Sequence, residues 1–335
     1  MPRNGQMLAQ RRPRPRGHGA AVAVVALVVA ALAASCAVPI ADLGGPSSGA
    51  AGINDAGIVV GSSELPGSTP EAFVSRAYKR LPDNSVVDLG TLDGFTSSDA
   101  WRINAGGVVV GTASGPSGSH AVRWEADGQI VDLGPGEAWD INDAGVVVGQ
   151  SALLRGFAFD PATGHQIAMP DLPGAIQSEA RGINNLGQVV GFQSMNGPTA
   201  AVLWDLETGV VTDLGETLTE VFLPFDINDA GTMVGTVRTG SPNRYQAQAA
   251  LLPVGWTAPI NLGVGGFSVA AALNESNTVV ISRLTTQQAF RWQPISGLVE
   301  IGGESSSLVL DVNEDGTMVG QDTGRAALFG VPPAS

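Results

Sequence analysis

The stretch that decides the fold is Ile141-Asn142-Asp143-Ala144-Gly145-Val146-Val147-Val148-Gly149. Asn and Asp start tight turns because their side chains bond the neighbouring backbone, and Gly adopts the positive φ that such turns need. The valines that follow prefer strands, and their unbroken run favours a strand that is buried on both faces. The stretch therefore predicts the end of one strand, a tight turn, and a second strand that returns beside the first.

Close variants of this motif occur at seven places in the chain. They begin at Ile53-Asn54, Ile103-Asn104, Ile141-Asn142, Ile183-Asn184, Ile227-Asn228, Leu273-Asn274 and Val312-Asn313. Successive copies are separated by between 38 residues (Ile103 to Ile141) and 50 residues (Ile53 to Ile103). A repeat of this length is typical of a propeller or a solenoid.

The second repeat illustrates what each unit contains. Its strands are expected at Ala100–Asn104, Val108–Gly111, His120–Trp124 and Gln129–Gly134, with polar or Gly-containing turns between them. Four short antiparallel strands make one propeller blade. We therefore expect an all-β fold, a seven-bladed β-propeller of four-stranded blades. One aromatic residue recurs in the third strand and is interpreted as packing against the neighbouring blade. These residues are Tyr78, Trp124, Phe159, Trp204, Trp292 and Phe329.

A second signature, Asp-Leu-Gly or a variant of it, marks the fourth strand of each repeat. Its copies begin at Asp42, Asp88, Asp132, Asp171, Asp213, Asn261 and Glu300. The first copy precedes the first Ile-Asn motif, and no copy follows the last repeat, which ends at Gly330. We therefore expect Pro39–Gly44 to be the fourth strand of the blade that begins at residue 308. The N-terminal strand would then pair with the C-terminal blade, close the ring and remove its exposed strand edges.

These motifs resemble those of the extracellular HAF-repeat proteins of bacteria. The unit of that family carries Ile-Asn-x-x-Gly-x-Val-Val-Gly, His-Ala-Phe-x-Trp and Asp-Leu-Gly-Thr-Leu. The matching stretches here are Ile141–Gly149, His120–Trp124, Gln288–Trp292 and Asp88–Leu92, and the resemblance covers about residues 40–330. The resemblance implies export and a repeat architecture, but it implies no particular activity.

The charge of the chain excludes one class of partner. Acidic residues outnumber basic ones by 31 to 17, and five of the basic residues are Arg within residues 3–16. The rest of the chain is therefore strongly acidic and would repel phosphate backbones, so we expect no nucleic-acid partner.

The N-terminus has the order of a secretory signal. Arg-rich residues 3–16 precede an uncharged apolar run, Ala20–Ala34, and small residues follow. The run is short for a membrane span, which needs about 20 residues. The site Ala33-Ala34-Ser35-Cys36 resembles a bacterial lipoprotein box, in which the Cys carries the lipid. We expect residues 1–36 to be a signal peptide with Cys36 as the lipid attachment site. Cleavage to a soluble secreted form and a retained membrane anchor are the alternatives.

Residues 37–335 are expected to form a single propeller domain in the extracellular space or the cell envelope. The domain would be held outside the cytoplasmic membrane, which it would contact only through the lipid anchor. Cys36 is the only Cys, so an intramolecular disulfide is excluded. We expect a monomer.

No residue pattern in the chain predicts catalysis. Only three His occur, and His120 is best interpreted as a surface residue of its repeat. We assign no catalytic and no cofactor-binding residues. Calcium is the one metal that the sequence suggests, because Asp311, Asn313 and Asp315 match the first half of an oxygen-ligand loop. The bidentate Glu of such loops is missing, and a plain hairpin turn is the alternative.

Strict repetition without a catalytic insertion favours a binding or scaffold module at the cell surface, whose ligand is a protein or a glycan. A secreted polysaccharide hydrolase or lyase and a purely structural envelope protein are the alternatives. An enzyme would need one blade that departs from the pattern. The longest departures are Gly61–Arg76 and Arg238–Pro259, and loops on a rigid scaffold are where function is usually located.

Overall fold

Antiparallel β-strands make up nearly all the regular structure in the described part of the chain. The computed structural model describes residues 37–68, 74–196, 199–218, 220–239, 246–302 and 306–330. One 3-10 helix, η1 (Leu214–Glu216), is the only helix within these ranges. None of the described residues forms a helix long and apolar enough to cross a membrane. The predicted signal peptide and Cys36 lie outside the described residues.

Each Ile-Asn motif joins the first and second strands of a four-stranded antiparallel unit. The first strands are β2 (Ser48–Ile53), β6 (Ser97–Ile103), β9 (Ile130–Ile141), β13 (Gln177–Ile183), β17 (Phe222–Ile227), β21 (Ser268–Leu273) and β25 (Ser307–Val312). The second strands are β3 (Val59–Glu64), β7 (Val109–Gly115), β10 (Val147–Ser151), β14 (Gln188–Ser194), β18 (Met233–Thr239), β22 (Val279–Arg283) and β26 (Met318–Asp322).

The third and fourth strands complete the units. The third strands are β4 (Ser75–Arg80), β8 (Gly118–Trp124), β11 (Gly156–Asp160), β15 (Thr199–Asp205), β19 (Gln246–Leu252), β23 (Gln288–Gln293) and β27 (Arg325–Phe329). The fourth strands are β5 (Val86–Asp88), the first part of β9, β12 (His165–Ala168), β16 (Val210–Asp213), β20 (Ile260–Asn261), β24 (Gly297–Glu300) and β1 (Val38–Pro39).

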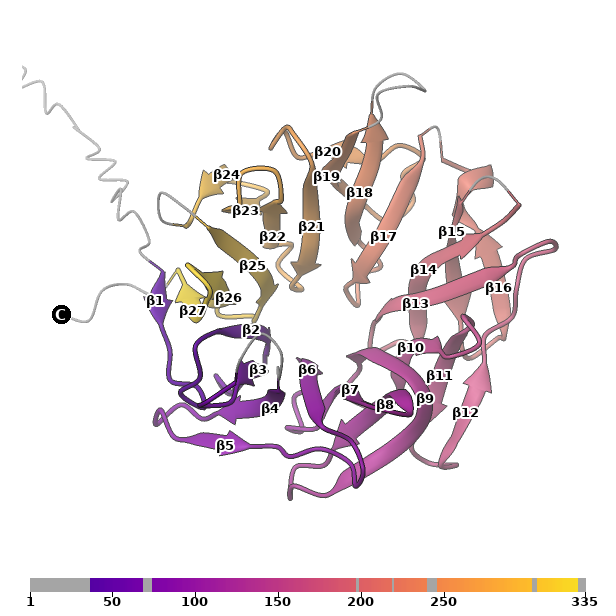
Figure 1. Cartoon of the computed structure of the whole chain (residues 1–335). Coiled ribbons are helices and arrows are strands. Elements are labelled where there is room, and N and C mark those ends of the chain that lie inside the picture. Colours follow the sequence, from indigo (N-terminus) through magenta and orange to yellow (C-terminus); the bar gives the residue numbers. More distant parts are fainter. Residues whose placement is uncertain are drawn as a thin grey trace, which may run out of the picture. The chain divides into compact units, whose positions relative to one another are not determined.

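Hydrogen bonding groups these strands into five four-stranded sheets and one seven-stranded sheet. The larger sheet arises because β9 pairs with β8 through its first half and with β10 through its second half. Figure 1 shows first strands such as β13, β17 and β21 near a common centre and fourth strands such as β5, β12 and β16 on the outside. The prediction of an all-β fold made of four-stranded antiparallel units is confirmed.

The N-terminal strand completes the C-terminal unit, as the offset of the two signatures predicts. Val38 pairs with Leu328 and Pro39 with Ala327 in an antiparallel arrangement. The strand is shorter than the expected Pro39–Gly44. The Asp42 carboxylate accepts a hydrogen bond from the Gly44 amide at 2.7 Å, which forms a local turn after the strand.

One fourth strand differs from its predicted position. The signature at Asp171–Gly174 suggests a strand there, but β12 ends at Ala168. Met169 occupies the place that Leu89 and Leu262 occupy in their units, because each of these residues donates its amide to a carbonyl of the third strand. Met169 is 5% exposed, so its side chain supplies the buried apolar contact that the signature Leu supplies elsewhere.

The core consists of apolar clusters between neighbouring sheets. Within the described ranges there are seven such clusters, each shared by two successive units. One of them joins Ala50 and Tyr78 of the first unit with Val319 and Ala326 of the last. The third-strand aromatic residues pack between sheets as predicted, and Trp124 and Trp204 are almost fully buried.

Candidate functional site

Every first strand contains a β-bulge two residues before the apolar residue of its motif. In β6 the register shifts between Ala100 and Arg102, so no residue of β7 lies opposite Trp101 in the strand register. The bulge explains the Gly that ends the Val-Val-Gly segment, because a Cβ on Gly111 would lie 1.9 Å from the Asp99 carbonyl oxygen. Bulges redirect side chains and are common next to functional sites. The bulge residues are Ala51, Trp101, Trp139, Arg181, Phe225, Ala271 and Leu310.

The Asn residues of the motif form a chain of hydrogen bonds around the centre. Each side chain uses its oxygen within its own turn, as Asn142 does by accepting from the Val146 amide at 2.9 Å. Its Nδ2 atom donates to the carbonyl oxygen of the Asn in the next unit. The chain runs from Asn54 to Asn104, Asn142, Asn184, Asn228, Asn274 and Asn313, and Asn313 donates to Asn54 at 3.4 Å.

A second layer of contacts comes from the residue just before the motif. Asp140 accepts a hydrogen bond from the Ile183 amide of the next unit at 2.8 Å. Asp226 and Asp311 make the equivalent bonds to the Leu273 and Ile53 amides at 3.0 and 2.9 Å. Each of the three carboxylates is followed, in the next unit, by a small residue at the same position. These small residues are Gly182, Ala272 and Gly52.

Arg102 occupies the one remaining position of this layer. Its guanidinium donates to the carbonyl oxygens of Ala51 at 2.9 Å and Trp101 at 3.1 Å, and more weakly to that of Leu310 at 3.5 Å. Burial lowers the pKa of Arg102, but the three carboxylates more than offset this effect, so the group stays charged. Arg102 therefore links three units and compensates the acidic layer.

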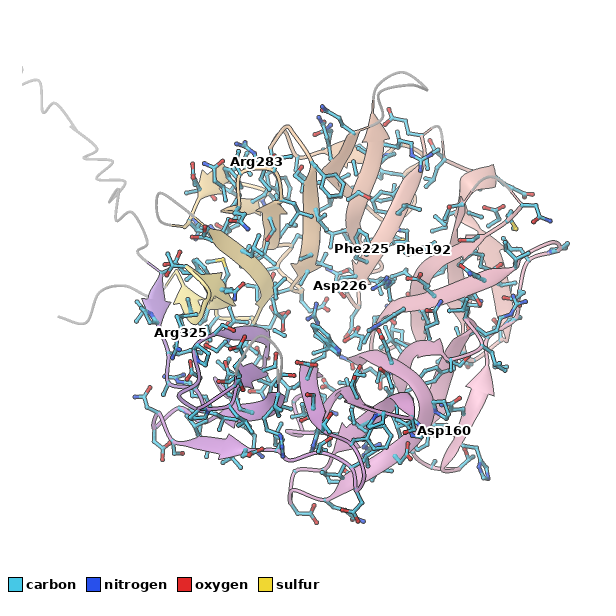
Figure 2. All side chains as sticks on the ribbon, in the orientation of Figure 1. Asp160, Phe192, Phe225, Asp226, Arg283 and Arg325 are labelled. Atoms are coloured by element: carbon cyan, nitrogen blue, oxygen red, sulfur yellow. The ribbon has the colours of Figure 1, made fainter. Side chains whose placement is uncertain are left out.

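The three carboxyl groups have raised pKa values because protein atoms enclose them. Burial raises the pKa of Asp140 to about 6, although Arg102 and two backbone amides lower it. Burial, and to a smaller extent the charge of Asp140, raises the pKa of Asp226 to about 8. Burial also raises the pKa of Asp311. Asp226 and Asp311 keep some accessible surface, and Figure 2 shows Asp226 near the centre.

One opening of the centre is a cavity of about 210 Å³ lined by Trp101, Arg102, Trp139, Arg181, Phe225, Val269 and Ala271. We call this opening the mouth. The Arg181 guanidinium stacks on Trp139 at 3.9 Å from the ring centre and pairs with Glu179. Trp139 donates its indole N–H to Glu137 at 3.1 Å. The mouth thus combines aromatic faces with fixed charged groups, which is the chemistry of a pocket that orients a ligand.

The other opening lies beside the Asn residues and has a volume of about 200 Å³. The residue that follows each motif Asn lies at the edge of this opening, and five of these seven residues are acidic. We call this group of Asp55, Asp143, Asp229, Glu275 and Glu314 the acidic rim. Neighbouring units are again linked here, because the Asp229 amide donates to Glu275 and the Glu275 amide donates to Glu314, both at 2.8 Å.

The three residues of the predicted calcium site make separate contacts. Asp311 accepts a hydrogen bond from the Ile53 amide. Asn313 accepts one from the Thr317 amide through its side-chain oxygen and donates one to the Asn54 carbonyl through its side-chain nitrogen. Asp315 lies exposed in the turn between β25 and β26. Among the described residues, no group of three or more His, Cys, Asp or Glu is arranged to hold a metal ion.

The other residues singled out from the sequence lie away from the centre. His120 contacts Asp132 through Nδ1 at 3.0 Å and packs its ring on Phe95. Within the departure Arg238–Pro259, Trp256 is described and 57% exposed, while residues 240–245 lie outside the described ranges. Sequence reasoning missed the mouth. The signal that marks it is the aromatic or basic residue at the bulge position of four repeats, where the others carry Ala or Leu.

Comparison with solved structures identifies the class of fold. The chain is similar to the Dos1 propeller, with 11% identity and a TM-score of 0.56 over 88% of this chain and 95% of that chain. It is also similar to a streptogramin B lyase, with 11% identity and a TM-score of 0.53 over 88% and 97% of the two chains. A third similar structure is YCF48 bound to D1 peptide, with 11% identity and a TM-score of 0.52 over 89% and 96%. No family model and no curated protein matches the sequence. Identities this low show the fold alone, which is that of a β-propeller.

Proposed function

We propose that the protein is an exported, seven-bladed propeller of the HAF-repeat type that binds a glycan at the mouth. The observation that carries this proposal is the lining of the mouth. Trp101, 38% exposed, and Phe225 offer aromatic faces on which a sugar ring can stack. Trp139 contacts both Glu137 and Arg181, two charged groups that can bond hydroxyl groups.

A closed ring of seven blades is part of this proposal. The hydrogen bonds of the seven motif Asn residues return to Asn54, which supports closure. The apolar cluster between the last and first units and the pairing of β1 with β27 support it as well. A rigid ring would hold the aromatic and basic side chains of four different units in one arrangement, and preorganisation of this kind favours binding.

The location follows from the N-terminal signal. We propose that Cys36 carries a lipid and holds the domain at the outer side of the cytoplasmic membrane as a monomer. A binding domain anchored there would meet glycans and proteins of the cell envelope. The propeller YCF48 is described with a bound peptide, so we propose a protein as the second class of partner.

The alternative of a polysaccharide hydrolase or lyase has less support. Asp140 and Asp226 have raised pKa values, as catalytic carboxyl groups often do. However, both oxygens of each carboxylate already accept hydrogen bonds from backbone amides. Those of Asp140 bond Ile141 and Ile183, and those of Asp226 bond Ile227 and Leu273. These bonds account for the two carboxylates as links between blades.

A glycan array tests the proposal. The full chain would be produced with its own N-terminus, purified in its processed form and applied to cell-envelope and other bacterial polysaccharides. We expect at least one glycan to bind, and its affinity to fall about tenfold in Trp101→Ala and Trp139→Ala, since buried aromatic anchors dominate binding energies. Trp256→Ala is the matched control, because Trp256 lies outside the mouth, and it should bind as the parent protein does.

Absence of binding to every glycan, or unchanged affinity in both mouth variants, would refute the proposal. Release of a shorter product from a bound glycan would replace it with the enzyme alternative. Mass spectrometry of the processed protein checks the location, because lipidation predicts an N-terminus at Cys36 with added acyl mass.

A further inference from the structure

A third cavity, of about 450 Å³, lies between two neighbouring units on the face that carries the acidic rim. Leu186, in the turn after β13, stands on one side of it, and Val254 and Trp256, in the turn after β19, stand on the other. These three side chains are 63%, 65% and 57% exposed. We call this cavity the turn pocket. Large apolar side chains exposed together around a cavity mark a surface that a partner covers.

The volume of the turn pocket suits the side chain of a ligand. Binding pockets usually measure about 300–1,000 Å³ and are mostly apolar with a few polar groups at the edge. The walls of the turn pocket include Leu203, Leu218 and Met233, and its polar edge includes Asp229. An aromatic side chain that entered would therefore be surrounded by apolar atoms and would meet a carboxylate at the entrance.

Asp229 connects the turn pocket to the acidic rim, because it lines both openings. The carboxylates of the rim are close enough to repel one another. Partial burial, and in addition the charges of Asp229 and Glu314, raise the pKa of Glu275. No Lys or Arg stands among the described residues that line either opening. A cation placed over the rim would relieve this repulsion.

We propose that this face docks an extended peptide segment of a partner protein. One large apolar side chain of the segment enters the turn pocket, and one or two Lys or Arg side chains that follow it lie over the acidic rim. The shared Asp229 places the two parts within reach of a few residues, since an extended chain advances about 3.3 Å per residue. This surface is separate from the mouth, so the inference does not rest on the proposed glycan.

The charge of the surface selects a basic peptide among the occupants of an apolar pocket. An anionic membrane surface would be repelled by the rim. An uncharged apolar molecule would fill the turn pocket but would leave the rim carboxylates uncompensated. A peptide that carries both groups uses the apolar and the acidic parts together, and its opposite charge would also speed association.

The test uses a synthetic peptide, Gly-Trp-Gly-Lys-Arg-Gly, amidated at its C-terminus and labelled with a neutral dye. Binding to the full processed chain would be measured by fluorescence anisotropy. We expect saturable binding that weakens as salt is added. Trp256→Ala should weaken it about tenfold, and the isosteric changes Asp229→Asn and Glu314→Gln about threefold each, because each removes one rim charge.

Two protein controls and two peptide controls make the test specific. Trp101→Ala alters an exposed Trp of the mouth, and Asp93→Asn removes an exposed acidic charge elsewhere, so neither should change the affinity. Peptides with Ala in place of Trp, or with two Glu in place of Lys-Arg, should bind at least about tenfold more weakly.

Three results of the peptide experiment would overturn the inference. The first is an absence of binding at millimolar peptide while circular dichroism shows folded protein. The second is equal binding of the Lys-Arg and Glu-Glu peptides, and the third is an affinity that Trp256→Ala leaves unchanged. In a separate experiment, binding to anionic vesicles that exceeds binding to neutral vesicles and is weakened by Trp256→Ala would assign the face to a membrane and would also contradict the peptide.

Discussion

Replacing Arg102 with Met should destabilise the domain, and the effect should depend on pH. The substitution keeps most of the side-chain volume but removes the hydrogen bonds to the Ala51, Trp101 and Leu310 carbonyls. It also removes the only positive charge that acts on Asp140, Asp226 and Asp311 in this layer. Removing one partner of a buried charged group costs about 3–5 kcal/mol. We expect a loss of this size at pH 8, where the carboxyl groups are most ionised.

The sign of the pH dependence follows from the raised pKa values. An Asp whose pKa is higher in the folded than in the unfolded protein destabilises the fold as it ionises. In the parent protein the stability contributed by Asp140 therefore falls as the pH rises from about 4 to about 6, and that of Asp226 continues to fall to about 8. For Asp140 this loss amounts to about 3 kcal/mol, from a shift of about two pKa units. Without Arg102 both pKa values rise further and the loss is steeper.

The assay is urea unfolding followed by Trp fluorescence at pH 4.5 and pH 8. At pH 4.5 more of the carboxyl groups are protonated, so Arg102→Met should lose mainly its hydrogen bonds, about 1–2 kcal/mol. The double variant with Asp226→Asn should regain part of the stability lost at pH 8. Arg155→Met is the control, because its ion pair with Asp171 is at the surface and contributes at most about 1 kcal/mol. An equal loss at both pH values, or a larger loss at pH 4.5, would refute the role given to Arg102.

Two further predictions concern the N-terminal strand and calcium. Deleting residues 37–45 should lower the melting temperature of the whole domain, and Asp42→Ala should cost about 2–3 kcal/mol because Asp42 pairs with Arg325 and accepts from Ser48. Asp88→Ala, which loses only the equivalent turn bond from the Gly90 amide, should cost about 1 kcal/mol or less. Thermal melting of Asp42→Ala and Asp88→Ala measures the difference between them. A protein truncated at residues 37–45 that melts like the parent would contradict a closed ring. Chelation of calcium should leave the melting curve unchanged, because Asp311 and Asn313 already bond backbone groups. A lower melting temperature together with calcium found by elemental analysis would instead support the predicted site.

The repeats, the hairpins and the N-terminal pairing were predictable because each depends on local or periodic signals. A turn such as Asn142–Gly145 fixes its own hairpin, and the offset of the two signatures places β1 beside β27. The fourth strand at β12 was placed wrongly because Asp171-Leu172 repeats the signature without its contacts. Buried Met169 satisfies the same position and cannot be recognised by type.

The centre was not predictable from a single repeat. Asn142 was interpreted through its own turn, and its oxygen does bond there, but its nitrogen reaches Asn184 in the next unit. A contact between units leaves a signal only in the alignment of all copies. The residue before the motif then shows the pattern, because the carboxylates alternate with small residues. In order, these residues are Gly52, Arg102, Asp140, Gly182, Asp226, Ala272 and Asp311.

That pattern also indicates where binding can occur. Buried backbone amides need acceptors, and three carboxylates supply them between neighbouring units. The small residues make room for the unit that follows, because a Cβ on Gly52 would lie 3.0 Å from the Trp101 carbonyl oxygen and one on Gly182 would lie 2.8 Å from that of Phe225. Seven positions cannot alternate completely between carboxylates and small residues, so one position is left over. Arg102 fills that position, offsets the acidic charge and contacts strands of other units. Because these bonds use the central groups, we place the proposed binding at the two openings and the turns. Residues such as Trp101 and Trp256 differ there from repeat to repeat, while the links between units are kept.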